Sequence, residues 1–313
     1  MKLLLPDSVP FDLPAIDGVD YIVYDIEHPI PAEHHDAEAL VAWGNSDAQL
    51  KSAASDLPRL RWVQTLAAGP DQAVNAGFAA DATITSGRSL HSATVAEHAL
   101  TLTLAAARNL HTLVRAQLGH RWATELGGRQ PIFDPNRFTT LRGAHVVIWG
   151  FGSIAQTLAP VLTTLGARVT GVARSAGERD GYPVVAEADI ADLLPSADVL
   201  IMILPGTPAT TRILDADTIA LLPGHAWLVN VGRGVTVDES ALIDALRENR
   251  LGGAALDVTE IEPLPVDSDL WDLANVIITP HSAGGRPIGA DQLIADNIRA
   301  LLAGRPLTNV VAR

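Results

Sequence analysis

Three residues that could act together on one small acid stand in three separate loops of the sequence. Arg233 lies in VNVGRGV, Glu262 in IEPLP and His281 in TPHSAGG, and each loop follows a short apolar run. A guanidinium fork matches a carboxylate and polarises a neighbouring keto oxygen. An imidazole can donate a proton near neutral pH, and a carboxylate on its second ring nitrogen orients it and favours its charged form. The set predicts hydride transfer to or from a 2-oxo or 2-hydroxy acid, with Arg233 on the carboxylate, His281 as acid/base and Glu262 as its partner.

Each of these residues has a plainer interpretation when it is taken alone. An Arg between glycines is usually a surface charge, and a His after a Pro is usually a turn residue or a hydrogen-bonded core group. Their shared setting favours chemistry, because open α/β sheets bind ligands beyond the carboxyl ends of their strands.

An upstream glycine motif offers a site for the hydride carrier. GFGSIA begins at Gly150, directly after the apolar run HVVIW and before a helical pattern. In a dinucleotide-binding loop, Gly150 allows the tight turn, Gly152 lets the backbone approach a pyrophosphate, and Ala155 allows close packing of helix on strand. The amides of Ser153 and Ile154, at the helix N-terminus, are then the expected phosphate donors. An ordinary strand-to-helix turn without a ligand is the alternative for this motif alone.

The choice of dinucleotide depends on the end of the next strand, where enzymes that use NAD place an Asp or Glu on the ribose. Here Ala173 stands at about that position, and Arg174 and Ser175 follow it. A 2′-phosphate would meet a cation and no repelling carboxylate, so the sequence predicts NADP(H) as the preferred cofactor, with NAD(H) possible. The alternative is that Arg174 is a solvated loop residue and that Glu178 or Asp180 reaches the ribose.

Composition excludes several other kinds of protein. The chain has 313 residues with 22 basic and 36 acidic side chains, a net charge of −14 that argues against nucleic-acid binding. It has no Cys, hence no disulfide and no thiolate metal site, and no pair of its His residues has a convincing metal spacing, so no metal is expected. MKLLLPDSVP does not resemble a signal peptide, and no apolar run reaches the roughly 20 residues of a membrane span. A cytoplasmic location is the default expectation.

Short β-rich runs alternate with helical patterns along the chain, as in α/β folds with parallel sheets and crossover helices. In the first ninety residues the expected strands are Lys2 to Leu5, Tyr21 to Tyr24, Leu40 to Trp43, Arg61 to Leu66 and Thr83 to Thr85. In the second region they are Val146 to Trp149, Arg168 to Val172, Val199 to Ile203, Trp227 to Val231, Gly253 to Leu256 and Val276 to Ile278. Each of the two regions is expected to form a domain of its own.

Between the two regions, the pattern from Ser92 to Leu118 contains no Pro or Gly and predicts one long Ala/Leu-rich helix. The stretch GGRQPIFDPNRFTTLRG that follows is rich in Gly, Pro and Arg and is typical of an irregular connection.

Taken in order, the motifs resemble those of the D-isomer-specific 2-hydroxyacid dehydrogenase family, which includes glyoxylate, hydroxypyruvate and phosphoglycerate dehydrogenases. The matching segments are TLAAGPDQ at Thr65, SATVAEHAL at Ser92, GFGSIA at Gly150, ILPGTPATTRIL at Ile203, VNVGRG at Val229, EPLP at Glu262 and TPHSAG at Thr279. They cover nearly the whole chain.

The resemblance implies two Rossmann-like or flavodoxin-like domains with parallel sheets, an active site in the interdomain cleft, and a last helix that returns to the first domain. Residues 1–92 plus 286–313 are then expected to form a substrate-binding domain, and residues 93–285 a dinucleotide-binding domain. It also implies a homodimer formed through the cofactor domain. Further residues are expected at the cofactor: Thr94, Leu204, Pro205, Thr210, Val231, Gly232 and Asp257.

Substrate contacts are also expected from the first domain. In the resembled family a loop after a strand offers backbone amides to the substrate carboxylate, and here Ala68 and Gly69 of LAAGPD are the candidates. Pro70 has no amide hydrogen and cannot contribute. Trp43 is a candidate wall of the pocket, and a core or hinge role fits it equally well.

The substrate expected is a small anionic 2-oxo or 2-hydroxy acid of the glyoxylate or hydroxypyruvate type, since no basic cluster for a phosphate is evident in the first domain. A larger 2-hydroxy acid or phosphoglycerate is the alternative. A hypothesis of another class is a corepressor-like protein that senses NAD(P) and binds partners without turnover.

Overall fold

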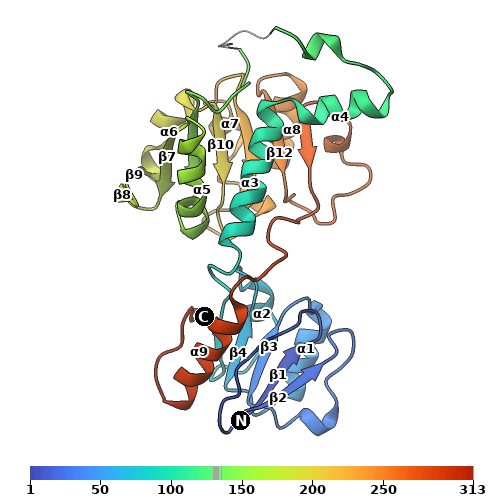
Figure 1. The fold of residues 1–313 in the computed structure, drawn as a ribbon, viewed down its shortest axis with the longest axis vertical. Coiled ribbons are helices and arrows are strands. Elements are labelled where there is room, and N and C mark those ends of the chain that lie inside the picture. The colour runs from blue at the N-terminus through green and yellow to red at the C-terminus, as the bar shows by residue number, and fades with distance from the viewer. Residues whose placement is uncertain (130–133, 135, 313) are drawn as a thin grey trace. The chain divides into compact units, whose positions relative to one another are not determined.

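The computed structural model describes residues 1–129, 134 and 136–312. Within them the chain divides into two compact units, Met1–His91 with Arg286–Arg313, and Ser92–Gly285. Each unit has its own sheet, parallel except for one edge strand of the second unit, with helices packed against it (Figure 1). The strands predicted from the sequence are confirmed, with ends that agree to within one residue.

The first unit is built on the sheet order β2-β1-β3-β4-β5, in which all pairs are parallel. Its strands are β1 Lys2–Pro6, β2 Asp20–Tyr24, β3 Ala39–Ala42, β4 Trp62–Thr65 and β5 Thr83–Thr85, and its helices are α1 Asp47–Asp56, α2 Asp71–Asn75 and α9 Ala290–Leu302. This strand order is that of flavodoxin-like sheets, which bind ligands at the carboxyl ends of their strands.

Both faces of this sheet are covered, because successive side chains of a strand point to opposite faces. Leu4 packs in a core with Leu50 of α1, whereas Leu3 packs on the other side with residues of α9. The apolar positions of α9 recur every four residues, at Ala290, Ile294 and Ile298, and so form one buried stripe. The C-terminal helix therefore belongs to the first unit.

The second unit is built on the sheet order β13-β12-β11-β10-β6-β7-β9-β8. Its strands are β6 His145–Trp149, β7 Arg168–Ala173, β8 Gly177–Arg179, β9 Tyr182–Ala186, β10 Val199–Met202, β11 Trp227–Asn230, β12 Gly253–Leu256 and β13 Val276–Ile278. Its helices are α3 Ser92–Ala107, α4 Leu110–Leu118, α5 Ser153–Thr164, α6 Ile190–Leu193, α7 Ala216–Ile219 and α8 Glu239–Arg247. The sheet changes direction of growth between β6 and β10, as in the doubly wound folds that bind dinucleotides.

Helices α3 and α5 share a core with one face of this sheet, and α6, α7 and α8 share a core with the other (Figure 1). Side chains such as Val147 and Ile148 are fully buried on opposite faces, which explains why these strands are continuous apolar runs. Short 3₁₀ turns lie at Ala32–His34, Thr124–Leu126, Glu187–Asp189, Leu194–Ser196, Gly234–Thr236 and Asp269–Trp271.

Two details differ from the sequence prediction. The single long helix from Ser92 to Leu118 is wrong, because the chain breaks between α3 and α4 at Asn109, whose φ of 49° is left-handed. Asn accepts this conformation more readily than most residues, so a helix can end without Gly or Pro. Strands β8 and β9 are not among those predicted, and β8 is an antiparallel edge strand on an otherwise parallel sheet.

Part of the Gly/Pro/Arg-rich connection, residues 130–133 and 135, lies outside the described residues. None of the helices that the structure does describe is long and apolar enough to cross a membrane.

Candidate active site

The register of the second sheet brings the predicted loops to one edge. Trp149, Met202, Asn230, Leu256 and Ile278 are aligned across neighbouring parallel strands and end five of them at the same level. The loops that carry the glycine motif, Arg233, Glu262 and His281 all begin directly after this row. The carboxyl edge of one sheet thus presents all of these groups.

The glycine loop packs tightly against the chain at Gly150 and is open to its surroundings at Gly152. Gly150 has a φ of 102°, and a Cβ there would lie 2.6 Å from the carbonyl oxygen of Ile203. A Cβ on Gly152 would meet nothing within 4 Å. Helix α5 begins at Ser153 without a side-chain cap, so the amides of its first turn, including that of Ile154, remain available to an anion. This is the geometry that a pyrophosphate needs.

Two more predicted residues extend this surface by backbone packing. A Cβ on Gly232 would lie 2.7 Å from the carbonyl oxygen of Leu204, so the loops after β10 and β11 touch each other through their main chains. Val231 is buried beside Gly232, and Pro205 is exposed. The hydroxyl of Thr210 donates to the Pro205 carbonyl oxygen at 2.6 Å and accepts from the Thr207 amide. Thr210 therefore shapes its own loop.

The Arg233 loop is folded by a side chain that the sequence did not single out. Asn230 is 1% exposed, accepts from the Gly232 amide at 3.0 Å and donates to the Arg233 carbonyl oxygen at 3.2 Å. The guanidinium of Arg233 is half-buried and bonds through Nη1 to the carbonyl oxygen of Gly232, at 2.8 Å. The other guanidinium N–H groups make no hydrogen bond within the described part of the chain, so they are free to bind an anion.

His281 and Glu262 meet directly, although they come from different loops. The Nδ1 of His281 lies 2.7 Å from Oε2 of Glu262, and Oε1 of that carboxylate accepts from the amide of Thr259 at 3.2 Å. A carboxylate accepts and does not donate, so Nδ1 carries the proton and Nε2 is the ring nitrogen left for a substrate. The side chains are 47% and 37% exposed, respectively, which leaves the pair accessible to a small molecule.

Asp257 lies under the loop that carries His281. Its carboxylate accepts from the Thr279 hydroxyl at 2.6 Å, the Ser282 amide at 2.9 Å and the Ala283 amide at 3.0 Å. Its side chain is 1% exposed. The structure therefore shows Asp257 organising the loop, in addition to the cofactor role expected from the sequence.

The loop after β7 carries the residues expected to select the dinucleotide. Arg174 and Ser175 are both exposed directly after the strand. The β8–β9 hairpin adds Arg179, whose Nη1 donates to the carbonyl oxygen of Phe151 in the glycine loop, at 2.9 Å. Arg179 was missed in the sequence because the strand that positions it has no apolar pattern. Glu178 is its neighbour on β8, and consecutive side chains of a strand point to opposite faces.

The predicted substrate loop belongs to the first unit and follows β4. Neither Ala68 nor Gly69 donates a backbone hydrogen bond to any part of the chain that the structure describes. The ring of Trp43 stacks on His91 with centroids 5.2 Å apart, and His91 Nε2 bonds to the Leu66 carbonyl oxygen at 2.8 Å. Trp43 is thus tied to the start of this loop. Thr94 lies half-buried on α3, in the second unit.

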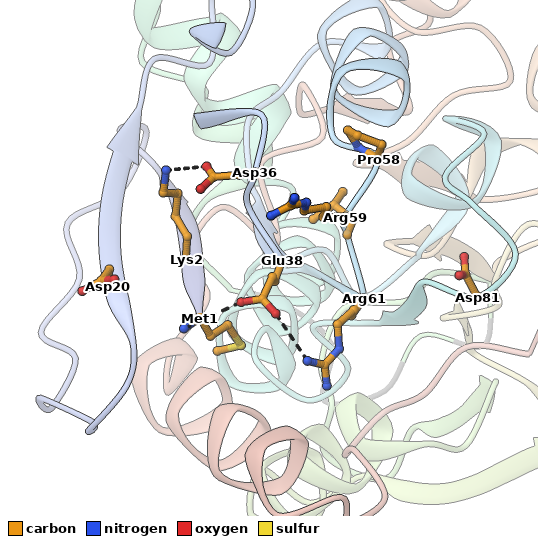
Figure 2. Close-up of a pocket in the computed structure, with 10 residues that line it drawn as sticks. Met1, Lys2, Asp20, Asp36, Glu38, Pro58, Arg59, Arg61 and Asp81 are labelled. Atoms are coloured by element: carbon orange, nitrogen blue, oxygen red, sulfur yellow. Dashed lines mark hydrogen bonds and ion pairs between the residues drawn. The ribbon is translucent and has the colours of Figure 1, made fainter. Parts of the chain in front are cut away.

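A charged hollow of about 550 Å³ lies elsewhere in the first unit, at the amino ends of its strands (Figure 2). Lys2 pairs with Asp36 at 2.5 Å, and Arg61 pairs with Glu38 at 3.4 Å. Its cations and carboxylates largely neutralise one another, and none of the predicted site residues lines it. Among the described residues, no group of three His, Asp or Glu side chains is arranged to hold a metal ion.

Comparison with known proteins agrees with this geometry. The profile of the family described as "D-isomer specific 2-hydroxyacid dehydrogenase, NAD binding domain" matches residues 100–283. A glycerate dehydrogenase of Methylorubrum extorquens is 31% identical over 263 residues, which are 82% of this chain and 80% of that protein.

Two solved structures are similar over nearly the whole chain. A D-isomer specific 2-hydroxyacid dehydrogenase from Xanthobacter autotrophicus, in complex with NADPH and MES, has a TM-score of 0.80 and 29% identity, covering 99% of this chain and 97% of that one. An NADPH-dependent glyoxylate/hydroxypyruvate reductase from Sinorhizobium meliloti, in complex with NADP and sulfate, has a TM-score of 0.79 and 25% identity, with the same coverage of 99% and 97%.

The doubly wound sheet, its glycine loop and these matches define an NAD(P)-dependent oxidoreductase. Within that class, the chain belongs to the D-isomer specific 2-hydroxyacid dehydrogenase family.

Proposed function

We propose that the protein reduces a small 2-oxo acid of the glyoxylate or hydroxypyruvate type to the D-2-hydroxy acid, with NADPH as the hydride donor. The observation that carries the proposal is the His281–Glu262 contact of 2.7 Å at the sheet edge that also holds the glycine loop and Arg233. The first unit is assigned to substrate binding and the second to the dinucleotide.

Proton transfer is assigned to His281. Its Nδ1–H is held by Glu262, so Nε2 is the ring nitrogen that can protonate the keto oxygen as the hydroxyl forms. The bond to Glu262 holds the ring in the orientation from which that proton leaves. In the reverse direction the same nitrogen accepts the hydroxyl proton.

Substrate binding is assigned to Arg233 with help from backbone amides. Within the described residues its guanidinium has one bond, to its own neighbour Gly232, and the remaining N–H groups can take a carboxylate in a forked contact. A second bond from the same fork to the keto oxygen would withdraw electron density from the carbon that accepts hydride. The free amides of Ala68 and Gly69 are the proposed additional donors to the carboxylate.

The second unit fits a dinucleotide by its shape. Gly150 could not carry a side chain, Gly152 faces open space, and α5 presents uncapped amides at Ser153 and Ile154. These features let the main chain approach a pyrophosphate closely. When bound, the reduced nicotinamide supplies the hydride.

NADPH is preferred to NADH in this proposal because of the charges after β7. Ala173 provides no carboxylate for a ribose diol, and Arg174 and Ser175 are exposed where a 2′-phosphate would lie. Arg179 directs the β8–β9 hairpin toward the glycine loop, which turns Glu178 to the other face. Two structural relatives, from Xanthobacter autotrophicus and Sinorhizobium meliloti, hold NADPH and NADP respectively.

A homodimer formed through the second unit is the proposed assembly. Exposed apolar side chains gather on α4 and just after it, namely Leu110, Leu113, Val114, Leu118 and Trp122. A run of this kind is typical of a protein interface. Light scattering should therefore give about twice the chain mass of 33.0 kDa, and a mass near 33.0 kDa would contradict the dimer.

The test of the reaction is turnover of NADPH and NADH, followed by nicotinamide absorbance, with glyoxylate, hydroxypyruvate, phosphohydroxypyruvate, phenylpyruvate and a branched 2-oxo acid. Fast oxidation of NADPH with glyoxylate or hydroxypyruvate is expected. Preference for a larger or phosphorylated acid would replace the substrate class, and preference for NADH would overturn the cofactor choice. Tight binding of NADPH with no turnover on any acid would favour a sensor instead.

A further inference from the structure

A second histidine lies behind the His281 loop. His98 is on helix α3, and its side chain is 20% exposed. Its Nε2 lies 2.9 Å from the Thr279 hydroxyl oxygen and 3.2 Å from Oδ1 of Asp257. His98 therefore contacts both ends of the hydrogen bond that joins Thr279 to Asp257.

The direction of these hydrogen bonds follows from the acceptor at their centre. The Asp257 carboxylate can only accept, so the Thr279 hydroxyl donates its single proton to it, at 2.6 Å. The oxygen of Thr279 then accepts from His98, which requires the proton of that ring on Nε2. A single N–H of His98 thus donates to the Thr279 oxygen and also lies close to Oδ1 of Asp257.

The segment held in this way determines where the acid/base group points. The main-chain N–H of His281 donates to the carbonyl oxygen of Asp257 at 2.8 Å, and the next two amides donate to the Asp257 carboxylate. His281 itself has a φ of 50°, in the left-handed region that residues with a side chain adopt infrequently. The contacts around Asp257 stabilise the loop in this conformation.

We propose that His98 is a positioning residue of the acid/base site, which acts on His281 through Asp257 and Thr279. This inference rests on the proposed function for the role of His281. A buried carboxylate with a missing partner relaxes toward other donors. Loss of the His98 N–H therefore frees Thr279 and Asp257 to shift, and the His281 ring moves with the loop.

Two substitutions at position 98 separate hydrogen bonding from packing, because one keeps an N–H donor and the other removes it. Gln at position 98 carries an amide N–H at nearly the reach of Nε2, whereas Leu fills similar space without a donor. Thr101 is the control on the same helix, because its exposed hydroxyl bonds to the Glu97 carbonyl oxygen and to no other group among the described residues.

In the His98→Leu variant, kcat should fall roughly ten- to a hundredfold, since a small misplacement of a reacting group costs that much. The KM for NADPH should change less than kcat, because the glycine loop is not touched and, of the residues expected at the cofactor, only Asp257 is disturbed. His98→Gln should recover most of the lost kcat, and Thr101→Ala should match the wild type. A purely packing role predicts the opposite order, with Leu tolerated better than Gln.

A second readout does not depend on turnover. Hydrogen exchange at the amides of Ser282 and Ala283 should accelerate in His98→Leu and stay slow in His98→Gln. If the Leu variant does not fold, Thr279→Val tests the same hydrogen bond from the loop side. In a double variant with His98→Leu the losses in kcat should not add, because both changes break one network.

Unchanged kcat and unchanged exchange in His98→Leu would overturn the proposal, and so would equal damage from Leu and Gln. Failure of the proposed function is a separate outcome. It is recognised if the wild-type protein does not oxidise NADPH with any of the 2-oxo acids. In that case the exchange rates of the variants still decide whether His98 holds the loop.

Discussion

The sheet of the second unit has a histidine–carboxylate pair on the side where its strands end, the carboxyl edge, and another on the side where they begin, the amino edge. At the carboxyl edge His281 Nδ1 lies 2.7 Å from Glu262, and at the amino edge His225 Nε2 lies 2.8 Å from Asp198. The distances are nearly the same. The side chains of the first pair are 47% and 37% exposed, and those of the second pair are 21% and 30% exposed.

The two pairs differ in the hydrogen bond that the second oxygen of each carboxylate accepts. The second oxygen of Asp198 accepts from the His145 amide at 2.7 Å, so this residue joins the starts of neighbouring strands. In the part of the chain that the structure describes, the carboxylate of Glu262 bonds only within its own loop and to His281. A histidine–carboxylate contact is therefore no mark of catalysis by itself. The loops around it, with Arg233 and the glycine motif, distinguish one edge from the other.

The largest effect should come from removing each imidazole in turn. His281→Gln should lower kcat by about a hundredfold to ten-thousandfold, the usual contribution of a positioned acid/base group. His225→Gln should leave kcat unchanged. Both are measured by steady-state NADPH oxidation with the best 2-oxo acid. Equal activity of the two variants would remove the functional distinction between the edges.

The next effect concerns the cation of the carboxyl edge. Arg233→Lys keeps the charge and loses the fork, so kcat/KM for the 2-oxo acid should fall roughly 10- to 100-fold. The KM for NADPH should hardly change. Arg247→Lys is the control, because that exposed arginine pairs with Asp269 on the surface. A fall in NADPH affinity without a change for the acid would reassign Arg233 to the cofactor.

Much of this edge could be predicted from the sequence, because its loops directly follow strands that are continuous apolar runs. Trp149 and the residues aligned with it end those strands. Because the strands are parallel, loops that follow them must lie at the same side of the sheet. The break at Asn109 could not be predicted, since nothing in the residue pattern requires a left-handed residue there. Strand β8 was not predicted because Gly177 and Glu178 are exposed, Arg179 is half-buried, and the segment has no apolar alternation.

The supporting contacts could not be predicted for a different reason. His98 appears in the sequence as one polar position of a helix, and only the fold brings it to Thr279, far along the chain. Asn230 directly precedes the VGRG loop, yet its two hydrogen bonds depend on how that loop turns back. Local patterns thus reveal the groups that meet substrate, whereas the groups that hold them depend on tertiary contacts.

Removal of the carboxylate should affect the amino edge more than the carboxyl edge when the free energy of unfolding is measured, the reverse of the order expected for kcat. Asp198→Ala leaves the His145 amide and His225 without their acceptor, which should cost about 1–3 kcal/mol in the free energy of unfolding. Glu262→Ala should cost about 1 kcal/mol or less, because its half-exposed partners can bond to water. Urea unfolding followed by circular dichroism compares them. A larger loss in Glu262→Ala would mean that the carboxyl edge also carries the stability of the sheet.

The smallest effect is a change in how stability depends on pH, and it belongs to the amino edge. Burial lowers the pKa of His145 from its ordinary value of 6.5, and the nearby Arg168 charge acts in the same direction. The neutral ring fits its site, because Nδ1 can donate to the Ser196 carbonyl oxygen while Nε2 accepts from the Thr170 hydroxyl.

From about pH 6.5 down to the lowered pKa of the folded state, the unfolded chain binds more proton at His145 than the folded chain does, so this contribution to stability is lost as the pH falls. Above that pH both states are neutral there, and the contribution is constant. His145→Gln keeps a donor and an acceptor but does not titrate, so its unfolding free energy should fall less steeply on acidification. Identical slopes for the variant and the wild type, in urea unfolding across this range, would show that His145 titrates alike in both states.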